Sequence, residues 1–283
     1  MRIEVKNISH VYSPGLPYET KALDNVSFTC EPGEFVGLIG HTGSGKSTLL
    51  QHLNGLLKPT SGQVLADGSD INEKSDEAKA LRRRIGLVFQ YPEYQLFEET
   101  VLKDVCFGPK NQGLSEEECI ARAMKAIELT GLDPEEKKDV SPFMLSGGEK
   151  RRVAIAGVLA MEPEVLILDE PTAGLDPKGR SDILQMIENI RQSRRLTIIL
   201  VSHNMDDVAA MAKHVLVMDK GRLVMDGTPK EVFARGAELS AIGLSRPAAA
   251  EFAQSLADRG LKINTSVLTI GDIEEEIVRL YSR

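Results

Sequence analysis

The stretch GHTGSGKS, from Gly40 to Ser47, restricts the fold of this chain more than any other feature. It follows the apolar run EFVGLIG, which is typical of a buried strand, and precedes a helical pattern from Lys46 to about Leu56. A glycine-rich loop between a strand and a helix turns backbone N–H groups toward one point, where the helix N-terminus adds positive potential. The sequence therefore predicts an α/β fold with a phosphate-binding loop.

The loop offers a full set of groups for a nucleoside triphosphate and its metal ion. Lys46 supplies a positive charge between phosphates, and the Ser47 hydroxyl can bind Mg²⁺. A glycine-rich turn without a ligand would need neither group. We expect the nucleotide to be held by nine consecutive residues, namely Gly40, His41, Thr42, Gly43, Ser44, Gly45, Lys46, Ser47 and Thr48.

Three later apolar runs end in polar residues that suit the other half of such a site. LILDE ends in Asp169, expected to hold the water shell of the metal, and Glu170, expected to polarise the attacking water. IGLVFQ ends at Gln90, whose amide could complete the metal shell, and IILVSH ends at His203, which could contact the γ-phosphate. Parallel strands of an α/β sheet place such ends at one edge. Taken alone, Gln90 and His203 are more typical of ordinary structural positions.

The aromatic residue that would stack on adenine is ambiguous in the sequence. Tyr12 is the first candidate, because it lies near the N-terminus in a segment that alternates like a strand. Tyr18 is its rival, and simple packing within the β-region is a third interpretation.

A second glycine pair, in LSGGE from Leu145 to Glu149, opens another predicted helix. Ser146 and Glu149 form a capping box, but that motif does not explain Gly147 and Gly148, since glycine is a poor helix former. Glycines at the first helical positions expose backbone N–H groups and create an anion site. Because the chain already has one phosphate loop, this second site is expected to face the nucleotide of another subunit, in a head-to-tail pair that closes on ATP and opens after hydrolysis.

The pattern of elements predicts two unequal parts. Residues 1–245 form one domain with an N-terminal β-region, a mostly parallel core sheet and an inserted helical subdomain at about 91–160. Residues 246–283 form a small C-terminal helical extension, a possible dimerisation element, whose second helix carries an apolar stripe of Ile273, Ile277 and Leu280.

Within the helical segment, one helix is marked from end to end. Ser115 and Glu118 form a capping box at its start, and Gly131 marks its end. The spacing of Ile120, Met124 and Ile127 predicts its buried face.

The composition of the chain argues against several classes of protein. The formal charge of −8 argues against a broad nucleic-acid-binding surface, so no nucleic-acid partner is expected. The three cysteines are scattered, which favours a reducing cytoplasm. The longest apolar run, Val153–Met161, is too short to cross a bilayer.

These motifs, in this order, resemble those of the ATPase subunits of ABC transporters over about residues 1–244. The resemblance implies a dimer driven by Mg·ATP, with a Walker A motif at Gly40–Thr48, Walker B at Leu166–Glu170, the signature at Leu145–Glu149, the Q-loop glutamine at Gln90, the D-loop at Ala173–Asp176 and the switch histidine at His203.

Two positions depart from the family pattern. Glu149 stands where the signature usually has glutamine, and Ala173-Gly174 replaces the usual Ser-Ala of the D-loop that ends at Asp176. Neither change removes a phosphate ligand or Glu170, so the resemblance still implies hydrolysis.

The segment from Phe89 to Ser115 is similar to the ATPases of energy-coupling factor (ECF) importers, which carry QYPE after the Q-loop glutamine. AIAGVLAMEPEVLILDEPTAGLDPKGR resembles the second of their two paralogous ATPases. The resemblance implies a peripheral protein on the cytoplasmic face of the cell membrane. Its partners would be a second ATPase (a paralogue or another copy), a transmembrane coupling subunit and a small membrane protein that captures a vitamin or metal ion.

The same resemblance implies a docking surface for the coupling subunit at Tyr91–Phe97, with Tyr91, Tyr94, Leu96 and Phe97 as its apolar residues. Plain helical-domain core is the alternative interpretation of this segment.

Three other functions remain open. A soluble ABC ATPase of DNA repair or translation usually has coiled-coil insertions or tandem cassettes, which this sequence lacks. A small-molecule kinase would have no use for LSGGE or Glu170. The ATPase of a dedicated cobalt or nickel importer is barely distinguished from the ECF type.

Overall fold

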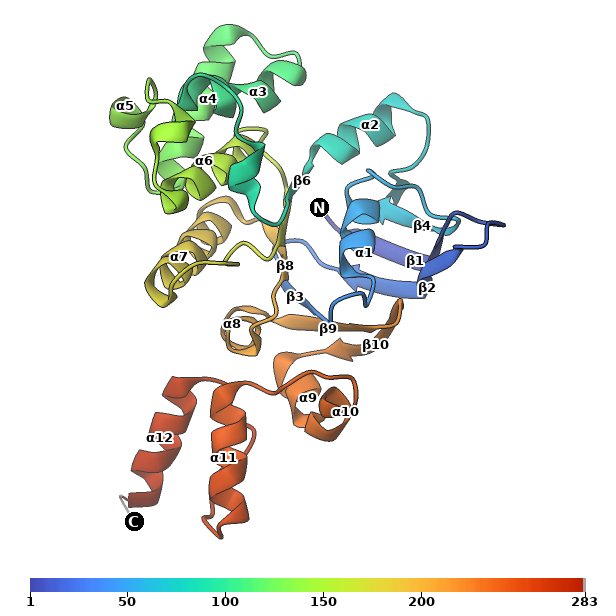
Figure 1. Ribbon diagram of the computed structural model, residues 1–283, viewed down its shortest axis with the longest axis vertical. Coiled ribbons are helices and arrows are strands. Elements are labelled where there is room, and N and C mark those ends of the chain that lie inside the picture. The colour runs from blue at the N-terminus through green and yellow to red at the C-terminus, as the bar shows by residue number, and fades with distance from the viewer. Residues whose placement is uncertain (282–283) are drawn as a thin grey trace.

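The computed structural model describes residues 1–281 and consists of two sheets with helices around them. The helical segment from α3 (Val101–Asn111) to α6 (Gly147–Leu159) forms a lobe at one end of the molecule (Figure 1). The helices α11 (Ala248–Asp258) and α12 (Ile270–Tyr281) lie at the opposite end, and the sheets lie between. The α/β class predicted from the sequence is confirmed.

The N-terminal sheet is antiparallel and has the strand order β2-β1-β4-β5. Along its central strand the residues Ile3, Val5 and Ile8 are buried, and a register shift after Val5 explains why the buried positions do not keep a period of two throughout. The strands are β1 (Ile3–Tyr12), β2 (Thr20–Cys30), β4 (Ser61–Ala66) and β5 (Ser69–Asp70).

The core sheet has the order β10-β9-β3-β8-β7-β6, and only the edge strand β10 is antiparallel to its neighbour. Every residue of β3 and β8 is buried, because helices and the first sheet cover both faces. The strands are β3 (Phe35–Ile39), β6 (Ile85–Val88), β7 (Val165–Asp169), β8 (Thr197–Val201), β9 (His214–Asp219) and β10 (Arg222–Gly227).

Helices follow the strands of the core sheet. The helix after the phosphate loop ends at Leu53, three residues earlier than predicted, because Gly55 takes a left-handed conformation with φ of 75°. Asp176 caps the long helix that begins at Pro177. The helices of this part are α1 (Lys46–Leu53), α2 (Asp76–Arg83), α7 (Pro177–Arg194) and α8 (Met205–Met211).

In the helical lobe the predicted capping box of Ser115 and Glu118 is present, but the predicted buried face is shifted by one residue. Ile120 is 40% exposed, whereas Cys119, Ala123 and Ile127 are buried. The small residues face α3 and α6, where the helices approach each other. The elements are η1 (Pro92–Gln95), α3 (Val101–Asn111), α4 (Glu116–Leu129), α5 (Pro134–Lys137), η2 (Pro142–Met144) and α6 (Gly147–Leu159).

The C-terminal helices build a small cluster of their own. The predicted stripe of α12 packs on it: Ile273 is buried against α11, and Ile277 and Leu280 lie beside it. The division at residue 245 stays a prediction, and residues 282–283 of the extension lie outside the described residues. The helices are α9 (Pro229–Ala234), α10 (Gly236–Ala241), α11 (Ala248–Asp258) and α12 (Ile270–Tyr281).

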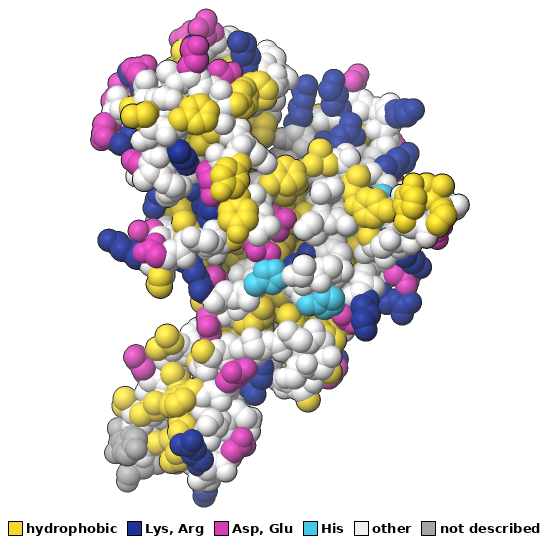
Figure 2. Space-filling view, viewed as in Figure 1, with side chains coloured by type: hydrophobic (Ala, Val, Ile, Leu, Met, Phe, Trp, Pro, Cys, Tyr) yellow, Lys and Arg dark blue, Asp and Glu magenta, His cyan; other side chains and the backbone are white. Residues whose placement is uncertain are grey.

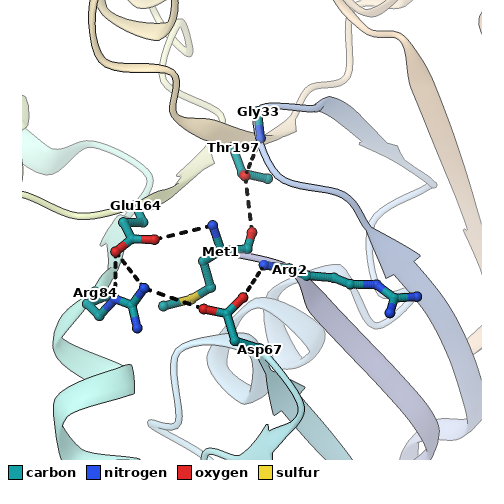
Figure 3. A network of polar contacts seen from close by, with 7 residues as sticks. All are labelled: Met1, Arg2, Gly33, Asp67, Arg84, Glu164 and Thr197. Atoms are coloured by element: carbon teal, nitrogen blue, oxygen red, sulfur yellow. Dashed lines mark hydrogen bonds and ion pairs between the residues drawn. The ribbon is translucent and has the colours of Figure 1, made fainter.

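A polar network joins the two sheets (Figure 3). The guanidinium of Arg84, just before β6, lies 2.6 Å from the carboxylate of Glu164 and 3.4 Å from that of Asp67, in the turn after β4. Asp67 also accepts a hydrogen bond of 2.8 Å from the backbone N–H of Arg2. These contacts fix the N-terminal sheet to the amino ends of β6 and β7. The phosphate loop lies at the other end of the core strands, after β3.

Candidate active site

A cleft of about 720 Å³ opens beside the phosphate loop, between the N-terminal sheet and the carboxyl ends of the core strands. It unites residues that lie far apart in the sequence. Ten of the predicted site residues line it, namely Tyr12, Thr42, Gly43, Gly45, Lys46, Ser47, Thr48, Gln90, Glu170 and His203.

Lys46 is held inside the loop by backbone oxygens. Its Nζ donates to the carbonyl of Gly40 at 2.6 Å and to that of His41 at 3.0 Å, and only 7% of the residue is exposed. Burial lowers the pKa of Lys46, and the nearby carboxylates of Glu170 and Asp169 oppose that shift. The loop thus concentrates a partly desolvated positive charge at the start of α1.

The loop also fits a bound phosphate in shape and in donors. Gly45 has φ of 101°, and a Cβ atom there would lie 2.6 Å from the carbonyl oxygen of Ala22, so only glycine allows this close approach. The hydroxyl of Ser44 is buried and has no hydrogen-bond partner in the described part of the chain. A buried donor without an acceptor suits an anion that binds the loop.

The turn between β9 and β10 makes polar contacts with the phosphate loop. The N–H of Gly221 donates to the Ser44 carbonyl at 2.9 Å, and Nε2 of His41 lies 2.8 Å from the carboxylate of Asp219. Sequence reasoning did not identify the part that Lys220 and Gly221 of this turn play in the site. Three other lining residues also escaped sequence reasoning, namely Thr20, Lys21 and Ala22.

Three strand ends meet at the carboxylate of Glu170, as the parallel-sheet argument predicted. His203 Nε2 lies 2.7 Å from Oε1, and Gln90 donates its amide to Oε2 at 3.0 Å. Glu170 itself has a left-handed φ of 50°, and its N–H donates to the carbonyl of Val201 at 3.1 Å. The neighbouring strand therefore fixes the direction in which this side chain points.

Asp169 and Ser47 suit a metal ion that shares its ligands with a nucleotide. Burial raises the pKa of Asp169, helped by the charge of Glu170, while the charge of Lys46 and the hydroxyl of Ser47 oppose that shift. A positive ion beside this carboxylate would favour its charged form. Among residues 1–281 no cluster of three or more His, Cys, Asp or Glu side chains could hold a metal alone. A metal here would take further ligands from the phosphates and water.

Two histidines that the sequence did not single out connect Tyr12 to α1. The Tyr12 hydroxyl lies 3.3 Å from Thr48 Oγ1, and its ring makes an edge contact with His10 at 4.5 Å. Nδ1 of His52 lies 2.7 Å from the Thr48 carbonyl, which can only accept, so Nε2 of His52 accepts from Nδ1 of His10 at 3.1 Å. Tyr18 is 68% exposed and does not line the cleft.

The LSGGE segment does not line this cleft. Leu145 is buried, Ser146 caps α6 together with Glu149, and no atom lies within 4 Å of the place where a Cβ would stand on Gly147 or Gly148. The first turn of α6 is therefore open to a partner. The D-loop residue Asp176 is also outside the cleft lining, and it accepts from the N–H of Gly179 at 3.1 Å.

Arg151, two residues after the LSGGE segment, joins α6 to two loops of the site. Its guanidinium binds both carboxylate oxygens of Glu93 at 3.1 and 2.7 Å. The same group donates to the carbonyls of Pro171 and Ala173, in the segment after Glu170, at 3.0 and 2.8 Å. Only 2% of Arg151 is exposed, so the signature helix, η1 and the D-loop share one buried charge.

The prediction that Leu96 is one of the apolar residues of an exposed docking surface is wrong. Leu96 is only 7% exposed and belongs to the main core, because the chain turns inward after η1. Tyr91, Tyr94 and Phe97 are 40, 83 and 56% exposed, and Phe107 of α3 meets Phe97 at 5.0 Å. We call these four aromatic residues the aromatic patch. Figure 2 shows hydrophobic side chains on this face of the helical lobe.

The chain is similar to known proteins over most of its length. Residues 23–173 match the family described as ABC transporter. The chain is 53% identical over 282 residues to the energy-coupling factor transporter ATP-binding protein EcfA2 of Clostridium tetani, covering all of this chain and 98% of that relative. It is 57% identical to the EcfA2 protein of Symbiobacterium thermophilum, covering 96% and 94%.

Two solved structures of ABC proteins are also similar to this chain. CbiO1 of Clostridium perfringens, part of the ABC transporter complex cbiONQ, has a TM-score of 0.74 and 43% identity over 85% of this chain and 93% of its own. The ATP-binding cassette MJ0796, solved as a dimer bound to ADP and Pi, has a TM-score of 0.70 and 31% identity over 80% and 98%. The chain is therefore an ATPase of the ABC transporter family and belongs, within that family, to the ATP-binding proteins of energy-coupling factor transporters.

Proposed function

We propose that this ATPase drives an ECF-type importer as a peripheral subunit on the cytoplasmic face of the cell membrane. One observation carries the proposal: Lys46, Gln90, Glu170 and His203 share one cleft, whereas LSGGE lies outside it with both of its glycines exposed. The cleft and the LSGGE segment would each supply one half of a nucleotide site. Such an arrangement suits a protein that binds ATP as a dimer.

Within the cleft the residues divide the work of hydrolysis. Glu170 accepts the proton of the attacking water, while Gln90 and His203 hold its carboxylate and the water in line with the γ-phosphate. Mg²⁺, held by Ser47 and Gln90 and through water by Asp169, would supply the charge that stabilises the leaving phosphates. Tyr12 is the better placed of the two tyrosines to stack on adenine, since it lines the cleft.

The dimer we propose is head-to-tail, with each ATP between the phosphate loop of one subunit and Leu145–Glu149 of the other. The second subunit is a paralogue or another copy of this chain. ATP then favours the closed pair because it binds both halves at once, and hydrolysis removes that linkage.

The partners beyond the ATPase pair are membrane proteins. No helix within residues 1–281 is long and apolar enough to cross a bilayer. The aromatic patch suits a transmembrane coupling subunit, which would in turn hold the small protein that captures the vitamin or other micronutrient. Identity above 50% to ECF proteins over nearly the whole chain favours this importer over a dedicated cobalt or nickel importer.

A mixing experiment tests the shared site. Lys46→Ala destroys the phosphate loop and Ser146→Arg blocks the signature, so each variant alone should show almost no ATPase. If the sites are shared, a mixture of the two restores one intact site per mixed dimer and with it up to about half of the activity per dimer. If the chain pairs only with a co-purified paralogue, the two substitutions are placed on different members of that pair.

Two outcomes contradict the proposal. One is that the mixture stays inactive although mixed dimers form. The other is that the unmodified protein keeps its specific activity on dilution to a concentration at which it is monomeric.

A further inference from the structure

The signature helix carries a negative charge at the place where it should attract phosphate. Glu149 is the third residue of α6, within one turn of Gly147 and Gly148. A carboxylate there is favourable for the helix itself, but it opposes the approach of a second anion to the same N–H groups. Glutamine, usual at this position in the resemblance noted above, would not have this effect.

The structure shows what offsets that charge. One oxygen of Glu149 accepts from the backbone N–H and the hydroxyl of Ser146 at 3.0 and 2.7 Å, and the other lies 3.0 Å from Nζ of Lys137. These contacts, with Ser146 as the larger contributor, lower the pKa of Glu149 to about 2. The carboxylate is therefore ionised at working pH, and a nearby cation can offset its charge.

Lys137 is well placed to be that cation. It is the last residue of α5, its side chain is only 20% exposed, and it also contacts Glu136 at 2.8 Å. The following residue, Lys138, makes a similar ion pair with Glu135 at 2.5 Å, but no contact with Glu149 is found. Of these two adjacent lysines, Lys137 contacts Glu149 and Lys138 contacts Glu135 instead.

We propose that Lys137 is a positioning residue of the shared nucleotide site. By pairing with Glu149 it neutralises the only carboxylate of the LSGGE segment and holds it against Ser146, which keeps the open N–H groups of α6 attractive to the phosphates of a nucleotide bound by the other subunit. The inference rests on the proposed function, because it requires that LSGGE meets a nucleotide.

The test measures the ATP concentration needed for half-maximal dimer formation, by sedimentation of the ATPase pair in a Glu170→Gln background that prevents turnover. Lys137→Met should raise that concentration about tenfold, the effect of one uncompensated charge near the phosphates. Lys137→Arg should keep it near the parent value. Lys138→Met is the matched control and should change it less than about twofold.

Rescue separates an electrostatic role from a structural one. When Glu149 is replaced by Gln, no carboxylate needs neutralising, so adding Lys137→Met to Glu149→Gln should have less than about a twofold effect. An equal loss in both backgrounds, or no loss in either, overturns the role of Lys137 while the proposed function stands. Absence of any ATP-dependent dimer in the Glu170→Gln parent overturns both.

Discussion

His203 Nε2 lies 2.7 Å from Oε1 of Glu170, and the other oxygen of that carboxylate accepts from Gln90 at 3.0 Å. The three side chains follow β8, β7 and β6, three neighbouring parallel strands. Both contacts come from side chains of the protein itself, and together they fix the direction of the carboxylate. Such preorganisation is what a general base requires.

Glu170→Gln should stop hydrolysis without preventing ATP binding. The amide keeps the size of the side chain but cannot accept a proton from water, so phosphate release should fall by a factor of about 10² to 10⁴. A dimer with bound ATP should accumulate, visible by size-exclusion chromatography. Glu162→Gln, a surface change before the same strand, is the control. Normal turnover by Glu170→Gln would show that another group is the base.

Sequence reasoning reached the strand ends of the site because they obey local rules. A run such as LILDE is apolar up to its last two residues, and parallel pairing aligns such ends whatever the connecting segments contain. The capping boxes at Ser115 and Ser146 are equally local, and both are present. Leu96 and the shifted face of α4 were missed because burial there depends on how the helices of the lobe pack on one another.

The long-range polar contacts could not be read from the sequence. Arg151 reaches Glu93 across 58 residues, and His52 reaches His10 across 42. No spacing rule links such pairs, because only the folded sheet and helices bring them together. The signal available in the sequence is the apolar run from Val153 to Leu159, which follows Arg151 in its helix.

Gly148→Ala should change stability and function in opposite directions. Nothing lies within 4 Å of the added Cβ, and alanine favours the helix, so the free energy of unfolding should rise by about 0.5–1 kcal/mol. The methyl group would cover the N–H groups of the first turn and raise the ATP concentration needed for dimerisation.

Gly157→Ala is the matched control for this change, because Gly157 lies on the same helix and its added Cβ also meets open space. It should stabilise the helix in chemical denaturation and leave dimerisation as it was. If both variants dimerise like the parent, Gly148 is not part of a nucleotide site.

Arg151→Met should destabilise the protein strongly. It leaves the carboxylate of Glu93 and two backbone carbonyls without their buried partner, a loss of about 3–5 kcal/mol in urea denaturation. Adding Glu93→Met removes the unpaired charge, so the double variant should recover part of the loss. Additive effects of the two changes would contradict the direct coupling of the pair.

Tyr94→Asp combined with Phe97→Asp should release the protein from membranes that contain its partners. Both side chains are more than half exposed, so the fold and the basal ATPase rate should survive. Leu56→Asp, a comparably exposed position in the turn after α1, is the control and should leave the protein bound. Leu96→Asp would be a poor test, since Leu96 is in the core. Membrane retention of the double variant would place the docking surface elsewhere.

His52 should make both stability and ATP binding depend on pH. Burial lowers the pKa of His52 below its ordinary value of 6.5, so the unfolded chain takes up the proton more readily than the folded one. The stability that neutral His52 contributes is therefore complete above pH 6.5 and is lost as the pH falls through the pKa of the folded state. Protonation also removes the lone pair that accepts from His10, the ring that packs on Tyr12.

His52→Gln removes this titration but keeps a hydrogen-bonding side chain in α1. On acidification from above pH 6.5, the unfolding free energy of the unmodified protein should fall more steeply than that of the variant, in parallel denaturant titrations. The apparent KM for ATP should likewise rise more in the unmodified protein. Identical pH profiles for the two proteins would show that His52 does not titrate in this range, and that the contact between Tyr12 and α1 does not depend on its charge.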